Sequence, residues 1–366
     1  MAKLLFVANK DNNFYNFRRE VITHLKEEGY DIVLVCPYGK KIDYFTERGC
    51  RFVDLPIDRR GMNAFKEITW LKRFFSIIKQ EQPNVVLTYT TKSSIYAGIV
   101  CTLLKVPYII NNAGLLNNDD TLVGKVLRVL YRWGFSKASC MMYQNSDERD
   151  FFNRLLKNRV PYRLLPGSGV NIDYFSFTPY PRYEGKIIFN YVSRIEKDKG
   201  IEEFLKCVSV INEKYPNVLF RIFGEYDDLQ YKKAVDELEK KGALHYMGTF
   251  LDIRPYIASC HAVIHPSYHE GMTNVTLEHG AMGRPALGSN VTGVKDTIDD
   301  GMTGFLFDVK SAESMAESIE RFIHLPFTEK ALMGEAARLK MHKEFNREQV
   351  YIKYSEEIAK IIQRCS

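Results

Sequence analysis

The hydrophobic positions in the first half of the chain form short continuous runs, separated by longer amphipathic stretches. The short runs, which predict buried strands, are 3–8, 31–36, 51–55, 85–89, 108–111 and 140–144. The stretches with apolar residues at helical spacing are 17–28, 65–80, 94–104 and 121–137. Strands that alternate with helices in this way form a parallel sheet covered by helices on both faces.

The same alternation restarts in the second half of the chain. Residues 175–185, FSFTPYPRYEG, have no periodicity and contain two prolines and a glycine, which is typical of a linker. The strands predicted after it are 186–191, 218–223, 262–266, 286–289 and 304–307. The predicted helices are 201–214, 230–241, 274–282, 312–324 and a region from 329 onward. We therefore expect two doubly wound α/β domains, whose ligands bind beyond the carboxyl ends of the strands.

The composition agrees with a globular protein of two domains. The chain has 366 residues, of which 45% are hydrophobic and 26% are charged, so it is not a disordered or collagen-like chain. Its seven cysteines are scattered and form no C-x-x-C pair, which favours reduced thiols over a zinc site or a disulfide framework. Because no apolar run approaches about 18 residues and the N-terminal run is short, we expect a cytoplasmic protein.

The positive charge is concentrated in the first half of the chain. Residues 1–178 contain 26 basic and 17 acidic side chains, whereas the remainder contains 25 basic and 28 acidic ones. This asymmetry points to an anionic partner or surface for the first half, or to a solvated basic face. No nucleic-acid motif accompanies the charge.

The most informative segment is HPSYHEGMTNVTLEHGAMGRPALGSN, 265–290. A strand ends at Pro266, a polar loop follows, and a helix starts with Thr273 or Asn274 as its cap. Its free N–H groups and dipole form an anion site, which Gly271 would let a phosphate approach closely. Glu270 and Glu278 flank the same helix start and could accept hydrogen bonds from sugar hydroxyls. Alternatively, both are solvated partners of the helix dipole.

A second candidate lies in YVSRIEKDKGIEEFL, 191–205. Arg194 and Lys199 occupy the loop between a predicted strand and helix, at the same sheet edge as Glu270. Two cations there could bind a diphosphate and stabilise the charge that develops as it departs. The alternative is a pair of ordinary solvated charges.

Several of these segments resemble a known family. SRIEKDKG at 193–200, EGMTNVTLE at 270–278, GAMGRPALGS at 280–289 and DDGMTGFLF at 299–307 are similar to the nucleotide-binding domain of retaining glycosyltransferases of family 4. In the first half, YNFRREVITHLKEEGY, RRGMN, TYTTKSSIYAG, NNAGLLN and YQNSDERDFF leading to PGSGVNIDYF resemble the members that build bacterial capsule, O-antigen and glycoprotein glycans. Those enzymes have the GT-B fold, with two Rossmann-like domains facing a central cleft.

The resemblance implies a role for each matching residue. Arg194 and Lys199 would hold the donor diphosphate, Glu270 would contact the transferred sugar, and Glu278 would hold the ribose; the implied catalytic set is Glu270, Arg194 and Lys199. The backbone N–H groups facing the phosphates would come from Gly271, Met272, Thr273 and Asn274. In the first domain, the implied acceptor or phosphate contacts are Arg59, Lys92 and Gly114, although Arg59 and Lys92 could equally be solvated charges.

The resemblance also implies the reaction and the domain limits. The enzyme would move a hexose or N-acetylhexosamine from a UDP-sugar to a polyprenyl-diphosphate-linked saccharide, retaining configuration, with no metal and no cofactor. The acceptor domain would span 1–178 and the donor domain 179–345, and a helix at 346–366 would cross back to the first domain. The alternatives are a GT-B sugar-nucleotide epimerase and a two-lobed nucleotide-sugar-binding protein without catalysis.

Two further patterns have more than one interpretation. His261, His265 and His269 recur every four residues like metal ligands on a helix, but the strand-like AVIHPSY between them argues against a shared face. The segments 69–79 and 124–137 combine basic and aromatic residues, with Lys125, Arg128 and Arg132 on one helical face. Such helices either pack on a sheet or rest on an anionic membrane, so we expect peripheral contact at the inner face of the cytoplasmic membrane.

Overall fold

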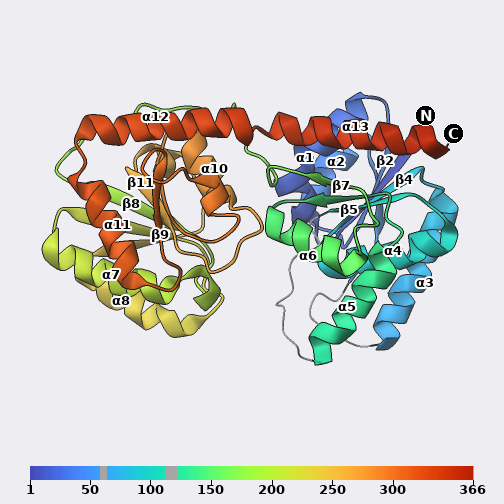
Figure 1. The fold of residues 1–366 in the computed structure, drawn as a ribbon, viewed down its shortest axis with the longest axis horizontal. Helices are drawn as coiled ribbons and strands as arrows, with labels where there is room; N and C mark the ends of the chain where they lie inside the picture. Colours follow the sequence, from blue (N-terminus) through green and yellow to red (C-terminus); the bar gives the residue numbers. More distant parts are fainter. Residues whose placement is uncertain (58–63, 112–121, 366) are drawn as a thin grey trace. The chain divides into compact units, whose positions relative to one another are not determined.

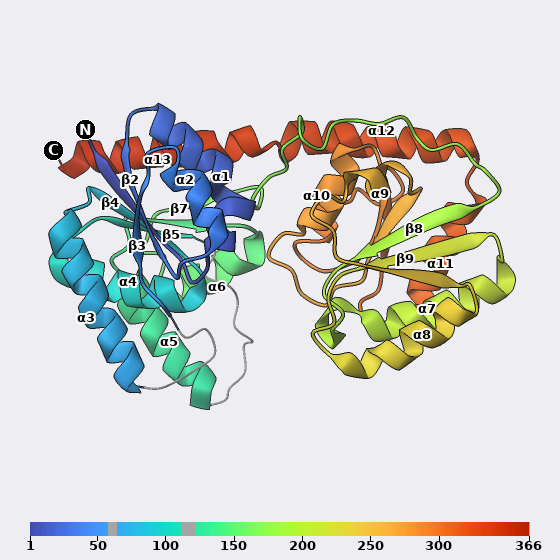
Figure 2. The same ribbon diagram turned by 180° about the vertical axis from the view of Figure 1, so that it is seen from behind.

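A computed structural model describes residues 1–57, 64–111 and 122–365. The chain forms two compact units, each with its own parallel sheet (Figures 1 and 2). Unit 1 comprises Met1–Ser168 and Glu348–Ser366, and unit 2 comprises Gly169–Arg347. The division therefore falls at Ser168, earlier than the limit of 178 that the linker composition suggested.

Unit 1 contains a seven-stranded sheet in the order β3-β2-β1-β4-β5-β6-β7, with parallel pairing throughout. Its strands are β1 (Lys3–Val7), β2 (Asp31–Cys36), β3 (Arg51–Asp54), β4 (Val85–Tyr89), β5 (Tyr108–Asn111), β6 (Cys140–Tyr143) and β7 (Tyr162–Leu164). The central strands are apolar along their whole length because helices bury both faces of the sheet. The order reverses between β1 and β4, where Phe6 lies opposite Leu87.

Two groups of helices cover the sheet of unit 1 (Figure 1). On one face lie α3 (Ala64–Glu81), α4 (Thr91–Leu104), α5 (Leu122–Phe135) and α6 (Ser146–Leu156). On the other lie α1 (Asp11–Glu27), α2 (Asp43–Thr46) and the C-terminal helix α13 (Arg347–Cys365). The last helix thus completes the core of unit 1, since Val350, Tyr354 and Ile358 are buried against it.

Unit 2 contains a six-stranded parallel sheet in the order β10-β9-β8-β11-β12-β13. Its strands are β8 (Ile187–Val192), β9 (Val218–Phe223), β10 (Leu244–Gly248), β11 (Ala262–His265), β12 (Ala286–Ser289) and β13 (Gly304–Phe307). The order reverses between β8 and β11, so the loops that follow these two strands start side by side. That position is where open α/β sheets bind their ligands.

The helices of unit 2 also lie on both faces of its sheet (Figure 2). On one face are α7 (Ile201–Lys214), α8 (Lys232–Lys240) and α11 (Ala312–His324), which share one apolar cluster with the strands. On the other are α9 (Arg254–Ala258), α10 (Asn274–Ala281) and α12 (Phe327–Glu344). No helix in the described part of the chain is both long and apolar enough to cross a membrane.

The buried side chain of Arg284 attaches the predicted linker to unit 2. Its guanidinium donates to oxygens of Thr178 and Pro179 at 2.8–3.0 Å and to carbonyls of the segments around α9 and α10. Further back, the N–H of Val170 donates to Phe345 O at 2.8 Å. These contacts make residues 169–178 part of unit 2, including 175–178, the first part of the segment 175–185 that the sequence predicted as an irregular linker.

The sequence prediction missed or shortened several elements. α1 begins at Asp11 rather than Phe17, and α6, β7, β10 and α9 were not predicted. The region from 329 onward contains two helices, α12 and α13, and the second begins at Arg347, close to the start of the helix expected at 346–366. β7 and β10 are edge strands with partly exposed residues, so they lack the apolar run that marks an interior strand.

Candidate functional site

The loops after β8 and β11 are in direct contact within unit 2. The N–H of Tyr268 donates to Asp198 O at 2.9 Å. Gly200 has a φ of +69°, and a Cβ on it would lie 2.2 Å from Pro266 O. Glycine is therefore required at this position by both its backbone conformation and the close approach of the two loops. This packing holds the SRIEKDKG segment against the HPSYHEG segment.

The two loops meet at the side chains of Lys199 and Glu270. Oε1 of Glu270 accepts hydrogen bonds from Lys199 Nζ at 2.7 Å, Ser267 Oγ at 2.7 Å and His265 Nε2 at 3.2 Å. The side chains of Lys199 and Glu270 are each 17% exposed. The ion pair is therefore mostly shielded from solvent but still accessible to a ligand. Two residues that the sequence predicted for one site are thus within bonding distance.

The surroundings keep the Glu270 carboxylate ionised. Burial acts to raise the pKa of Glu270, but His265 and Lys199 lower that pKa to about 2. Because an ionised carboxylate only accepts hydrogen bonds, Nε2 of His265 carries the donated proton. The site therefore presents a fixed negative charge throughout the physiological pH range.

Arg194 is held in a different way from Lys199. Its guanidinium pairs with Asp227 and, at 2.6 Å, with Glu196, and half of its side chain is exposed. Gly224, with a φ of +146°, supports this loop, since a Cβ there would lie 1.8 Å from Ser193 O. Arg194 and Lys199 therefore project from one loop toward different carboxylates.

The loop 270–273 leads directly into α10. Thr273 is the N-cap residue in extended conformation, and its buried hydroxyl has no hydrogen-bond partner among the described residues. The N–H of Thr273 donates to Gly293 O, and a Cβ on Gly293 would lie 2.5 Å from Glu270 O. The first-turn N–H groups of α10 have no partners within the helix, as at any helix N-terminus. The N–H of Thr273, one of the four predicted to face a phosphate, is instead bonded to Gly293 O.

Glu278 lies in the second turn of α10, and its side chain makes no hydrogen bond or ion pair with any described residue. Burial raises the pKa of Glu278 to about 7, and the charge of Arg347 lowers it by a smaller amount. A carboxylate in this state lacks donors, and the hydroxyl pair of a ribose supplies two. The structure thus places both glutamates of the E-x7-E pattern around one helix start, in different electrostatic states.

Two family models divide the chain between them. The model described as "Glycosyl transferases group 1" matches residues 175–340, and the model described as "Glycosyl transferase 4-like" matches residues 3–145. Together they cover most of the chain, one on each unit, and their order agrees with the two sheets described above. The chain is a family 4-type glycosyltransferase with the GT-B fold.

Curated relatives of this glycosyltransferase are named for lipid-linked sugars. One, from Campylobacter jejuni, is N,N'-diacetylbacillosaminyl-diphospho-undecaprenol alpha-1,3-N-acetylgalactosaminyltransferase, 23% identical over 96% of this chain and 95% of the relative. Another, from Escherichia coli, is UDP-Gal:alpha-D-GlcNAc-diphosphoundecaprenol alpha-1,3-galactosyltransferase, 23% identical over 81% of each chain. Among solved structures, Anabaena HepE in complex with UDP and glucose has a TM-score of 0.78, with 13% identity over 98% of this chain and 100% of that one.

In unit 1 of the glycosyltransferase, Lys92 lies in the first turn of α4, at the carboxyl edge of the sheet. Its Nζ is 2.5 Å from Glu67 Oε1 on α3. Thr90, just before the helix, has a φ of +69°, which β-branched residues rarely adopt and which makes the turn from β4 sharp. Arg59 and Gly114, the other two first-domain candidates, lie outside the described residues.

Two of the three histidines that recur every four residues, His261 and His265, have separate environments. His261 accepts the N–H of Ile188 at Nδ1, and burial lowers its pKa to about 4. His265 bonds to Glu270. Within the described ranges, no group of three side chains could hold a metal ion. The spacing of four therefore reflects a strand and a loop, and it brings only His265 to the candidate site.

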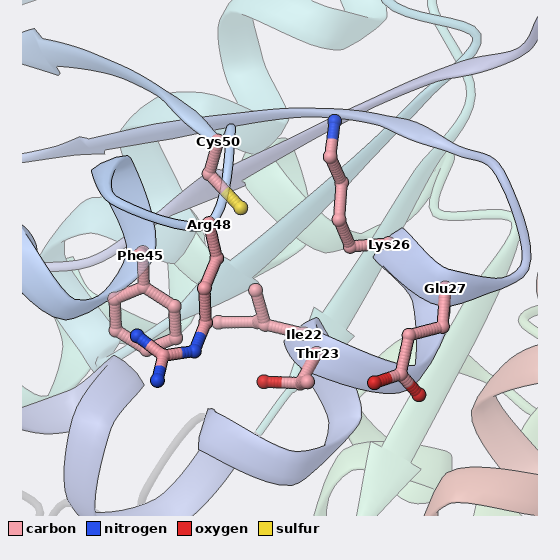
Figure 3. A pocket seen from close by; sticks show the side chains of 7 residues that line it. All are labelled: Ile22, Thr23, Lys26, Glu27, Phe45, Arg48 and Cys50. Carbon is pink, nitrogen blue, oxygen red and sulfur yellow. The ribbon is translucent and has the colours of Figure 1, made fainter.

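A pocket of about 290 Å³ lies elsewhere on unit 1, between α1 and the turn that leads into β3 (Figure 3). Its lining residues are Ile22, Thr23, Lys26, Glu27, Phe45, Arg48 and Cys50. Cys50 directly precedes β3, so the pocket lies at the amino edge of the sheet, opposite the edge where such folds bind ligands. Burial raises the pKa of the Cys50 thiol to about 11, so the pocket presents no reactive thiolate at neutral pH.

The sequence reasoning did not identify two of the hydrogen-bond partners of Glu270, His265 and Ser267. Both precede it in the same segment, and only their spacing of five and three residues could have indicated them. The tight loop after the strand reverses the direction of the chain, so the side chains of His265 and Ser267 lie next to the Glu270 carboxylate. Ser267 O in turn accepts Ser289 Oγ at 2.5 Å, so β12 also supports the loop.

Proposed function

We propose that this glycosyltransferase moves a hexose or N-acetylhexosamine from a UDP-sugar to a polyprenyl-diphosphate-linked saccharide, with retention of configuration. The observation that carries the proposal is the Lys199–Glu270 pair beside the N-terminus of α10, at the point where the strand order of unit 2 reverses. A cation, a helix N-terminus and an ionised carboxylate at one sheet edge suit a diphosphate joined to a sugar. The relatives named for undecaprenyl-diphosphate substrates support the acceptor class.

In the proposed reaction, the bond between the anomeric carbon and the β-phosphate oxygen of UDP breaks. The acceptor hydroxyl oxygen bonds to the same carbon from the same face, and its proton passes to the departing phosphate. Lys199, Arg194 and the N–H groups at the start of α10 stabilise the negative charge that develops on UDP. Since these groups supply positive charge where other transferases use a cation, we propose that the reaction needs neither metal nor cofactor.

Glu270 contacts the transferred sugar in this proposal, and Glu278 contacts the ribose. The two residues suit these tasks because their electrostatic states differ. Glu270 has strong protein donors and keeps its charge, so it presents a fixed acceptor to the sugar hydroxyls. The Glu278 side chain has no donor among the described residues, so hydroxyl groups of a ligand would satisfy it.

The first test measures UDP release from a panel of UDP-sugars, with and without polyprenyl-diphosphate-linked saccharides and without added metal. We expect release from one donor only when an acceptor is present, and loss of that release in Lys199→Ala. UDP-sugar binding without turnover on any acceptor would contradict the transferase proposal. Acceptor-independent conversion of the sugar would indicate an epimerase instead.

The raised pKa of Glu278 predicts pH-dependent nucleotide binding. Ribose hydroxyls donate to the ionised form, which is depleted below pH 7, so UDP affinity should fall roughly tenfold between pH 8 and pH 6. Calorimetry of UDP binding across this range measures the effect. The phosphate of UDP titrates too, so Glu278→Gln is the control: it should bind more weakly at pH 8 and show a shallower pH dependence. Equal slopes for both proteins would contradict the ribose role.

An exposed face of α5 supports peripheral contact with an anionic membrane. Val126, Val129 and Trp133 form an apolar ridge at helical spacing, and 66% of the Trp133 side chain is exposed. Lys125 and Arg132 are exposed beside this ridge. A helix with adjacent apolar and basic stripes lies in the interface of an anionic bilayer.

A second helix adds apolar surface at the same end of unit 1. Phe65 and Ile68, in the first turns of α3, are exposed. Both views of the ribbon place the first turns of α3 and α5 at one end of this unit (Figures 1 and 2). We propose that this end rests on the inner face of the cytoplasmic membrane, where a polyprenyl-linked acceptor would be found.

Membrane contact predicts a specific loss of vesicle binding. Changing Lys125 and Arg132 to glutamine should weaken binding to anionic vesicles by about 2 kcal/mol, since each basic residue contributes about 1 kcal/mol. Trp133→Ser should weaken it further at high salt, where the apolar contribution dominates. Vesicle co-sedimentation measures both effects. The matched control is Leu332→Ser with Leu339→Ser on α12, which removes exposed apolar side chains from unit 2. Equal losses in the control would contradict the proposed face.

A further inference from the structure

The two oxygens of the Glu270 carboxylate are held unequally. Lys199, Ser267 and His265 all donate to Oε1. No residue in the described part of the chain donates a hydrogen bond to Oε2. A carboxylate oxygen has about two lone pairs, so the three donors saturate Oε1 and fix the plane of the group. Oε2 is the oxygen left to accept a hydrogen bond from a ligand.

The three donors differ in how readily they could leave Glu270 and bind a diphosphate instead. Lys199 carries a charged group on a flexible stem, and a bound diphosphate would compete with Glu270 for it. Ser267 and His265 are buried and have shorter side chains than Lys199, with 0% and 3% exposure. When Lys199 turns to a diphosphate, only these two donors still hold Oε1.

Both of these donors are anchored by the sheet. His265 is the last residue of β11 and pairs with Gly288 on β12. Ser267, two residues later, is fixed by the hydrogen bond from Ser289 Oγ, at the end of β12, to its carbonyl oxygen. Their positions therefore depend on paired strands, whereas Glu270 itself lies in the loop beyond.

We propose that His265 and Ser267 are positioning residues that hold Oε1 of Glu270 while Lys199 binds the donor diphosphate, so that Oε2 meets the transferred sugar. The inference rests on the proposed function, in which Glu270 contacts the sugar and Lys199 the diphosphate. His265 and Ser267 act through Glu270 and touch no substrate. Their effect should thus depend on the presence of Glu270.

The test compares Ser267→Ala and His265→Leu with wild type for UDP affinity and for kcat of transfer. UDP lacks the transferred sugar that Glu270 would contact, so UDP affinity should stay within about twofold. In contrast, kcat should fall about 10- to 100-fold because the carboxylate loses its fixed orientation. His265→Gln keeps an N–H donor and should restore most of the loss. In a Glu270→Ala background, Ser267→Ala should cause no further decrease in the residual rate.

The matched controls are two buried residues that do not contact Glu270. Ser318 donates to Leu306 O, and His261 accepts the backbone N–H of Ile188. Because neither side chain bonds to Glu270, Ser318→Ala and His261→Gln should keep wild-type kcat. If Ser267→Ala and His265→Leu fall in UDP affinity as much as in kcat, their role is structural and the inference is wrong. It is also wrong if Ser267→Ala and His265→Leu both keep wild-type kcat while Glu270→Ala is inactive. If Glu270→Ala itself retains full transfer, the proposed function fails instead.

Discussion

Glu270→Gln should lower kcat of sugar transfer by about a hundred- to a thousandfold, with UDP affinity nearly unchanged. The substitution keeps the shape of the side chain but removes the charge that Lys199 and His265 hold in place. Loss of one preorganised electrostatic group at a reaction centre typically costs this much. Steady-state kinetics with saturating UDP-sugar, together with calorimetry of UDP binding, measure the two quantities.

A neighbouring carboxylate serves as the control for Glu270. Glu203, on α7, accepts a hydrogen bond from Tyr268 OH at 2.7 Å and so supports the same loop from another side. Glu203→Gln removes a charge close to the site without removing a predicted sugar contact, and it should change kcat by less than about tenfold. If the two variants lose activity equally, the charge near the loop matters and Glu270 has no special role. Full activity of Glu270→Gln would contradict the proposed contact with the sugar.

Arg284→Met should destabilise unit 2 by about 3–5 kcal/mol. Arg284 is 0% exposed, and its guanidinium donates to seven different backbone or hydroxyl oxygens, none of them a carboxylate. Methionine fills a similar volume but leaves the carbonyls of Ile257, Ala258 and Pro179 without their donor. Removing one partner from a buried charged network typically costs this amount. Urea unfolding followed by circular dichroism measures this loss of stability.

Two substitutions make the Arg284 result specific. Arg284→Lys keeps the charge but has three donors without the planar fork, so most of the loss should remain. Arg221→Met, on β9, removes a partly exposed arginine that donates to Ser259 Oγ, and we expect a cost of about 1 kcal/mol. If Arg284→Met and Arg221→Met have equal costs, the linker is not attached to unit 2 through Arg284.

The interior strands were predictable because burial on both faces leaves a direct mark on the sequence. Each of β1, β2, β4 and β11 is a short apolar run with few polar interruptions, and the structure places each within a residue or so of its predicted limits. The alternation of these runs with helices was enough to predict two parallel sheets. That part of the fold follows from local composition and from the need to bury both faces of each strand.

Other elements had local signals that apolar periodicity does not report. α6 starts with a capping box, in which Asn145 accepts the N–H of Glu148 at 2.8 Å and Glu148 accepts the N–H of Gln144 at 3.1 Å. The pattern N-S-D-E could have indicated this helix. The early start of α1 had a weaker signal, since its first turn is polar and is stabilised by burial of Phe14 against Phe6 and Tyr89.

By itself, the sequence determined the class of fold, the family resemblance and the pair of loops that carry Lys199 and Glu270. These depend on contiguous residues, in which apolar runs, glycines and charged positions are read directly along the chain. The tertiary structure alone decided that Lys199 bonds to Glu270 while Arg194 pairs elsewhere, because both cations lie in one loop and only packing sets their directions.

The tertiary structure also decided the states of the two glutamates. Glu270 and Glu278 are the same residue type eight positions apart, yet one is fixed as an anion and the other has its pKa raised to about 7. The difference comes from burial and from donors that other strands bring into reach, His265 from β11 and Lys199 from the loop after β8. Solvation and hydrogen bonding depend on neighbours in space, so spacing along the chain placed these carboxylates but did not set their charge.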